Sequence, residues 1–159
     1  EVVIMKNLFV LILVSLGFSA FSQEEHEHFH KNELGVSIAP VFFIPSEGVA
    51  VGLHAHYVKN IKSENFGIGL GAEYIFNEEK HQTYSVVFDY RLIGGLHVIA
   101  APGVAIESEQ DKLEAVFAVH LETNYEFELK HFNLGPSFEF AWDPHDIHYN
   151  LGIHLSIPF

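Results

Sequence analysis

The sequence predicts an all-β fold in which eight antiparallel strands follow one another up and down and close into a barrel. Apolar and polar residues alternate almost without interruption from Leu96 to Phe159, and short turn sequences separate the alternating segments. No segment repeats apolar residues at the spacing of a helix. Because successive side chains of a strand point to opposite faces, each of these strands has one apolar and one polar face.

Residues 1–22 are expected to lie outside this fold. Met5 is the expected start of the protein, and Lys6, an apolar run over 8–18 and the small-residue site Ala20-Phe21-Ser22 follow it. This is the layout of a secretory signal peptide cleaved after Ser22. The apolar run is shorter than the roughly 20 residues that a membrane-spanning helix needs.

The next segment, 23–32, is rich in histidine and glutamate and has no apolar face. We expect it to be a disordered lead-in, so that residues 33–159 form a single barrel domain. The chain has no cysteine and therefore no disulfide. Its net charge is −13, with seven lysines and one arginine, which excludes nucleic acid as a partner because phosphate binding needs clustered positive charge.

The eight strands are each near the roughly 10 residues that a tilted strand needs to cross a bilayer. Most of the expected turns are rich in Gly, Pro, Asn and Asp, as in Pro45-Ser46-Glu47-Gly48, Gly94-Gly95 and Asp143-Pro144-His145-Asp146. The predicted strands are 33–44, 48–58, 66–76, 82–92, 95–107, 112–129, 131–142 and 147–158.

The faces favour a transmembrane barrel. No charge interrupts the apolar face, aromatic residues recur near the strand ends, and glycine is frequent on the polar face, as a narrow lumen filled by side chains requires. Strand alternation is also compatible with a soluble periplasmic calyx for an apolar ligand, in which the apolar face points inward. The two alternatives predict opposite faces in the interior.

The closing segment carries a resemblance. Tyr149, Leu151, Ile153, Leu155, Ile157 and Phe159 share one face, and together with the signal peptide and the eight hairpin-linked strands this ending resembles the small outer-membrane β-barrel proteins of Gram-negative bacteria. The resemblance implies an outer-membrane location and contact with its lipid. It also implies that Leu155, Ile157 and Phe159 are the signal read by the barrel-assembly machinery.

Three prolines conflict with an unbroken sheet. Pro40, Pro102 and Pro136 lie inside predicted strands, where each removes a ladder hydrogen bond. They are interpreted as bulges or bends that help a small barrel to curve. The alternative is that they end strands and change the strand count.

The polar face predicts a salt-bridge network that plugs the lumen. Arg91, the only arginine, lies beside Asp89 and is expected to centre this network. Its carboxylates outnumber one guanidinium, so some are expected to be neutralised or to meet water near the rims. The other predicted members are Glu73, Glu114, Glu122 and Glu139.

The twelve histidines raise a second hypothesis, a metal-binding envelope protein that takes Zn or Cu. The candidate ligands are His54, His56 and His120 in the lumen and His26, His28 and His30 in the lead-in. Without a metal, the lumen histidines are expected to hydrogen-bond neighbouring carboxylates.

A lipid-acting hydrolase is the catalytic alternative. His154 and Ser156 have a spacing similar to that of the lipid A deacylase family, with Glu139 as an orienting carboxylate. However, both residues fall on the lumen face, and Ile157 stands where that family has asparagine. The function expected from the sequence is therefore a monomeric outer-membrane barrel with a structural or envelope role, without catalysis and without a required cofactor.

Overall fold

The computed structural model describes residues 30–44, 48–61, 65–77, 81–109 and 112–159. The signal peptide and residues 23–29 of the lead-in, with His26 and His28, lie outside the described residues. Among the described residues there is no helix long and apolar enough to cross a membrane.

Nine strands make up the sheet. They are β1 (Asn32–Ile44), β2 (Val49–Asn60), β3 (Phe66–Phe76), β4 (Gln82–Arg91), β5 (Leu96–Glu109), β6 (Lys112–Tyr125), β7 (Phe127–Glu128), β8 (Asn133–Trp142) and β9 (Ile147–Pro158). The two residues of β7 continue β6 along the same neighbour, β8, so the wall of the barrel has the eight strands that the sequence predicts.

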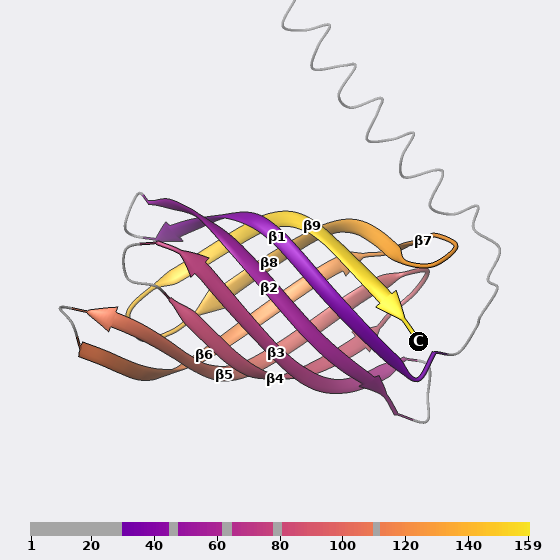
Figure 1. Cartoon of the computed structure of the whole chain (residues 1–159), viewed down its shortest axis with the longest axis horizontal. Helices are drawn as coiled ribbons and strands as arrows, with labels where there is room; N and C mark the ends of the chain where they lie inside the picture. The colour runs from indigo at the N-terminus through magenta and orange to yellow at the C-terminus, as the bar shows by residue number, and fades with distance from the viewer. Residues whose placement is uncertain (1–29, 45–47, 62–64, 78–80, 110–111) are drawn as a thin grey trace, which may run out of the picture.

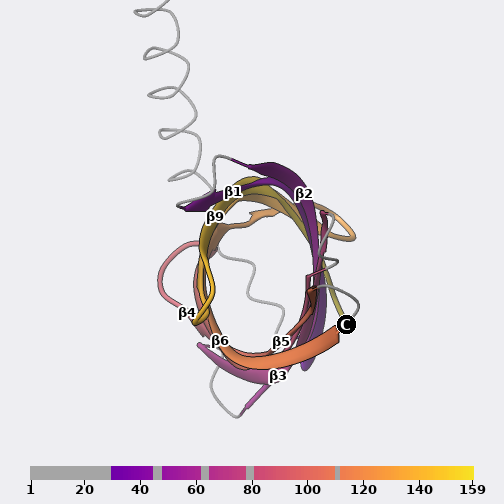
Figure 2. The ribbon, with the colours of Figure 1, turned by 90° about the vertical axis from the view of Figure 1, so that its left-hand side faces the viewer.

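The sheet is antiparallel and closed. Its order is β6-β5-β4-β3-β2-β1-β9-β8, and pairing of β6 with β8 completes the ring. Figure 1 shows the strands tilted across the long axis, and Figure 2 shows the ring seen along that axis. Closure leaves no long unpaired edge, which is a requirement for a sheet surrounded by lipid.

The seam between β1 and β9 brings distant parts of the chain together. Asn32 and Phe159 exchange backbone hydrogen bonds of 2.9 and 2.8 Å. We call this end of the barrel the Asn32 end; it also carries the turn of Gly94 and Gly95, whose φ angles are +56° and +83°. The opposite end, which carries the loop 143–146, is the Asp143 end.

The polar face points inward and the apolar face outward. In β8 the pattern is regular: Asn133, Gly135, Ser137, Glu139 and Ala141 are buried, and every residue between them is exposed. Leu70 is 66% exposed and Leu151 is 63% exposed. A continuous apolar outer surface matches a bilayer rather than water, so the alternative of a soluble calyx does not fit this structure.

The prolines neither form bulges nor end strands. Pro40, Pro102 and Pro136 lie inside β1, β5 and β8, and the register is the same before and after each of them. In the ladder of β1 with β9, for example, Ile38↔Ile153 is followed by Val41↔Asn150 without an added residue. The interpretation of these prolines as bulges was wrong.

Each proline instead interrupts the ladder on one side, because it has no N–H to donate. The pairing of β6 with β8 stops at Asn124↔Ser137 and resumes in β7 at Phe127↔Leu134, with Pro136 in the gap. This gap divides the predicted strand 112–129 into β6 and β7. The strand predicted from residue 131 begins at Asn133, because Leu129 and Phe132 close the turn before it.

Candidate functional site

Buried histidines and carboxylates fill the lumen. Because the chain has a single arginine and Lys31, Lys59 and Lys130 are exposed, the imidazoles are the main partners of the described carboxylates. Among the described residues the buried set, which we call the lumen column, is His54, His56, His81, His97, His120, His148, His154, Glu33, Glu73, Asp89, Glu107, Glu122, Glu126, Glu139 and Asp143.

The centre of the lumen column joins β2, β6 and β8. His120 Nδ1 donates to Glu139 Oε1 at 2.7 Å. The other oxygen of Glu139 lies 3.4 Å from His54 Nδ1, which in turn lies 3.2 Å from Glu122 Oε2. Glu73 Oε2 lies 3.6 Å from the same Nδ1 atom of His120. These histidines and carboxylates form one connected network, so the strength of each contact depends on the others.

The column continues toward the Asn32 end. His154 lies 3.8 Å from Glu122 through Nδ1 and 3.2 Å from Glu126 through Nε2. His97 then joins Glu126, at 3.6 Å, to Asp89, at 3.1 Å. The turn at Gly95 fixes Glu126, whose backbone N–H donates to the Gly95 carbonyl at 2.8 Å. His97 and His154 therefore each have a carboxylate oxygen near both ring nitrogens, which holds the two rings between neighbouring strands.

At the Asp143 end the column reaches the loop before β9. Glu107 contacts His81 and His145, each at 3.1 Å, and His148 contacts Asp146 at 3.0 Å. Burial acts to raise the pKa of Asp146, but the hydrogen bond with His148 and the nearby imidazolium charge hold it below its ordinary value. Asp146 at this rim is thus an ionised partner of His148.

His145 should titrate above an ordinary histidine. Its ring is 44% exposed, and the hydrogen bond to Glu107 raises its pKa above 6.5. The folded state therefore holds the proton to a higher pH than the unfolded state. Any stability from this contact is present below the unfolded pKa and is lost as pH rises through the folded pKa.

An NMR titration of the His145 ring in micelles checks this expectation. Glu107→Gln is expected to move the pKa of His145 down toward 6.5, because the charged partner is gone. Glu128→Gln changes an exposed residue at the opposite end of the barrel. This control variant should leave the pKa of His145 unchanged. Equal values in all three proteins would contradict the pairing of His145 with Glu107.

A glycine makes room for two of the imidazoles. Gly35 in β1 pairs with His56 in β2, and β9 on its other side carries His154. A Cβ on Gly35 would lie 2.3 Å from His56 Nε2 and 2.7 Å from His154 Cε1. The stacked rings of His56 and His154, 5.2 Å apart, therefore depend on a residue without a side chain.

The structure places Asp89, Glu73, Glu122 and Glu139 of the predicted network inside the lumen column, and two predicted members elsewhere. Arg91 does not centre the network: its side chain is 35% exposed at the Asn32 end, and it binds Glu33 at 3.2 Å and not Asp89. Glu114 is exposed at the start of β6, outside the column. Both corrections arise because strand ends reach the rims, where a residue on the inward face is no longer enclosed.

Several other column members were absent from the predicted network, and His154 was named only as a candidate of the hydrolase alternative. Glu33, His81, Glu126, His148 and His154 all stand at buried positions. For His148 and His154 the alternation of β9 gave the signal, since both fall on its polar face. Nothing in the sequence indicates which residues face each other across the lumen, so their pairing was not predictable.

Comparisons with known proteins agree on the fold. No protein-family model and no curated protein matches the sequence. Among solved structures, Neisserial surface protein A is 8% identical, with a TM-score of 0.52 over 80% of this chain and 96% of that one. The N-terminal β-barrel domain of Pseudomonas aeruginosa OprF is 10% identical, with a TM-score of 0.51 over 82% and 100%. This chain has the fold of the small outer-membrane β-barrels.

A de novo designed transmembrane β-barrel is also similar, at 13% identity and a TM-score of 0.54 over 82% of this chain and 99% of that one. All three of these structures are no more than 13% identical to this chain. The likeness of this chain to the small outer-membrane barrels therefore concerns architecture, and its chemistry has to be argued from its own lumen.

The hydrolase alternative places His154, Ser156 and Glu139 in one triad, but in the described part of this barrel they do not form one. Ser156 is fully buried in the lumen and accepts a hydrogen bond from Asn133 at 3.1 Å. His154 is hydrogen-bonded to Ser37 at 3.0 Å, and Glu139 binds His120 and His54 instead. The residues that a lipid hydrolase needs together are thus engaged separately.

The candidate metal ligands His54, His56 and His120 all lie in the lumen, whereas the described part of the lead-in leaves His30 exposed. Each described group of three possible ligands has its ligand atoms within 4.8 Å of one another. The groups are Glu33-His56-His154, His54-His56-Glu122, Glu73-Glu139-His148 and His81-Glu107-Asp143.

Proposed function

We propose that this protein is a monomeric outer-membrane barrel with a structural or envelope-maintenance role, whose lumen is closed to solutes and catalyses no reaction. The observation that carries the proposal is the filled lumen. Glu122 and Glu139 are 2% exposed, and His154 is fully buried. An eight-stranded barrel is only wide enough to be filled by its own side chains, so this interior supports a plug and not a channel.

The outer face supports insertion into the outer membrane. Leu155 and Ile157 point outward from β9, and Phe159 directly follows this strand; their exposures are 36%, 44% and 58%. They form the alternating apolar ending that barrel-assembly machinery is expected to recognise. The loops at both ends of the barrel span only a few residues each, which supports a structural role over adhesion or reception, since outer-membrane barrels usually carry longer loops on their extracellular side.

Fractionation of Gram-negative cells that express the full-length chain tests this function. We expect the protein in the outer membrane, with its N-terminus at Gln23 and a shift in gel migration on boiling. Purified protein in planar bilayers should give no ion conductance above that of protein-free lipid. Recovery as a soluble periplasmic protein would overturn the location, and steady single-channel currents would overturn the closed lumen.

A further inference from the structure

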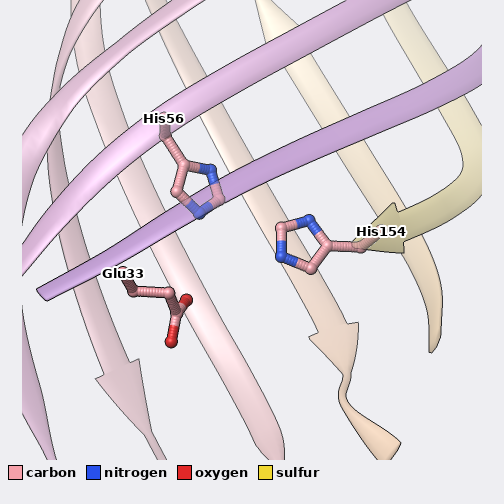
Figure 3. A group of neighbouring side chains, drawn as sticks. All are labelled: Glu33, His56 and His154. Carbon is pink, nitrogen blue, oxygen red and sulfur yellow. The ribbon is translucent and has the colours of Figure 1, made fainter. Parts of the chain in front are cut away.

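We propose that Glu33, His56 and His154 bind a divalent transition-metal ion, for which Zn²⁺ is the probe, inside the barrel near its Asn32 end. This inference rests on the barrel fold and adds a binding site to the structural role. Figure 3 shows the three side chains converging on the same part of the lumen. Their ligand atoms all lie within 4.8 Å of one another.

The sheet register brings the three residues together. They come from the adjacent strands β1, β2 and β9, with β1 in the middle. His56 lies opposite Gly35, and His154 lies opposite Ser37, one inward position further along β1. Glu33 is the inward position on the other side of Gly35. The two imidazoles thus occupy the space that the missing side chain of Gly35 leaves inside the lumen.

His56 differs from every other buried histidine in the described part of the chain. The other six each have a carboxylate oxygen within 4.0 Å. The structure gives His56 no hydrogen bond and no ion pair, only ring contacts with His54 and His154, although it is 3% exposed. Buried polar groups are normally paired, so an imidazole left with a free lone pair points to a ligand.

His154 also has a ring nitrogen without a hydrogen-bond partner. Its Nε2 is 3.2 Å from Glu126 Oε1, yet the two atoms are not aligned as a hydrogen bond, and each is buried without a hydrogen-bond partner. Of the two oxygens of Glu33, Oε2 binds Arg91. Two imidazoles and one carboxylate are therefore available around one point.

The donor set selects the class of ion. Two nitrogens and one oxygen suit Zn²⁺ and similar divalent transition metals, whereas Ca²⁺ and Mg²⁺ prefer oxygen ligands alone. The chain has no cysteine, so it offers no thiolate to a softer ion. Zinc–ligand distances of about 2.0–2.2 Å place the ligand atoms about 3.3 Å apart, so binding requires the three side chains to rotate toward one point.

The other groups are less suited to a metal. His54-His56-Glu122 shares His56, but His54 and Glu122 already lie 3.2 Å apart as partners. A metal there has to displace that contact and the contact of His54 with Glu139. The groups nearer the Asp143 end contain no histidine without a carboxylate partner, whereas the Glu33 group contains His56.

Zn²⁺ binding to the purified full-length barrel in detergent, measured by titration calorimetry and by metal content after dialysis, tests the site. We expect one bound Zn²⁺ per chain and weaker binding of Mg²⁺ and Ca²⁺. Glu33→Gln, His56→Gln and His154→Gln should each weaken Zn²⁺ binding at least about 10-fold, the low end of losses seen around metal sites. Binding should also fall near pH 5, as imidazole protonates.

Two control variants distinguish this site from Zn²⁺ binding at the other histidines. His97→Gln changes a buried histidine at the same end that belongs to no ligand group, and the triple change of His26, His28 and His30 to Gln removes the lead-in ligands. Both proteins should keep the Zn²⁺ affinity. Loss in the lead-in variant, loss in His54→Gln without loss in Glu33→Gln, or no loss in any variant would each overturn the site.

The boiling-dependent shift on a gel is recorded for every variant, so that only folded barrels are compared. Where a Gln variant lacks the shift, the same position is changed to Ala instead, and the shift and Zn²⁺ binding of the Ala variant are measured. Failure of the shift in the wild-type protein contradicts the proposed barrel function. A normal shift without Zn²⁺ binding contradicts the metal site alone.

Discussion

Glu139→Gln is expected to lower the free energy of unfolding of the barrel by about 3 kcal/mol. Glu139 is 2% exposed and holds two imidazoles, His120 at 2.7 Å and His54 at 3.4 Å. Removing one partner of a buried ion pair leaves an uncompensated buried charge, which costs about 3–5 kcal/mol. The lower part of this range applies because Glu122 and Glu73 remain beside the same two histidines.

Urea-induced unfolding in lipid vesicles measures this loss. Glu114→Gln is the matched control, since Glu114 is the same residue type on the same predicted face but is exposed. It should change the stability by less than about 0.5 kcal/mol. Equal stabilities of the two variants would show that the buried carboxylate of Glu139 carries no ionic contact of consequence.

Leu70→Arg is expected to destabilise the inserted barrel by about 2–4 kcal/mol. Leu70 is 66% exposed on the outer face and lies near the middle of β3. An arginine at this depth has to leave its charge in hydrocarbon or distort the bilayer to reach water, and the cost is largest at the midplane. Hydrogen bonding within β3 is unaffected, so the loss reports lipid contact.

The same unfolding measurement on Leu113→Arg is the control. Leu113 is also outward, with 79% exposure, but it is the second residue of β6 and lies at the Asp143 end. The cost there should fall to about 0–1 kcal/mol. If both arginines cost the same, the apolar belt does not lie across a bilayer in the way that the fold implies.

The fold was largely predictable because its determinants are local. Alternation with a period of two specifies both the strand and its faces, and the glycine pair at 94–95 specifies a tight turn. The predicted strands 66–76 and 147–158 have the same bounds in the structure. Fine breaks were not predictable. The division of the sixth strand depends on Pro136, which is near it in space but distant in sequence.

The candidate site was predictable only in part. Alternation shows that His54, His56 and Glu122 point inward, and they do. It contains no information on which inward residues meet across the lumen, so Arg91 was expected beside Asp89 but binds Glu33 instead. The importance of Gly35, which admits two imidazoles from neighbouring strands, also depends on sheet register and has no signature in the sequence.

The seam between β1 and β9 also has a bearing on folding kinetics. It joins residues up to 127 positions apart, so the entropy of closing nearly the whole described chain has to be overcome before this pairing forms. Chains dominated by such distant pairings fold slowly. Because β9 contributes His148 and His154, the histidine–carboxylate interior stays hydrated until that late step, and its desolvation and the completion of the ring should appear as one kinetic event.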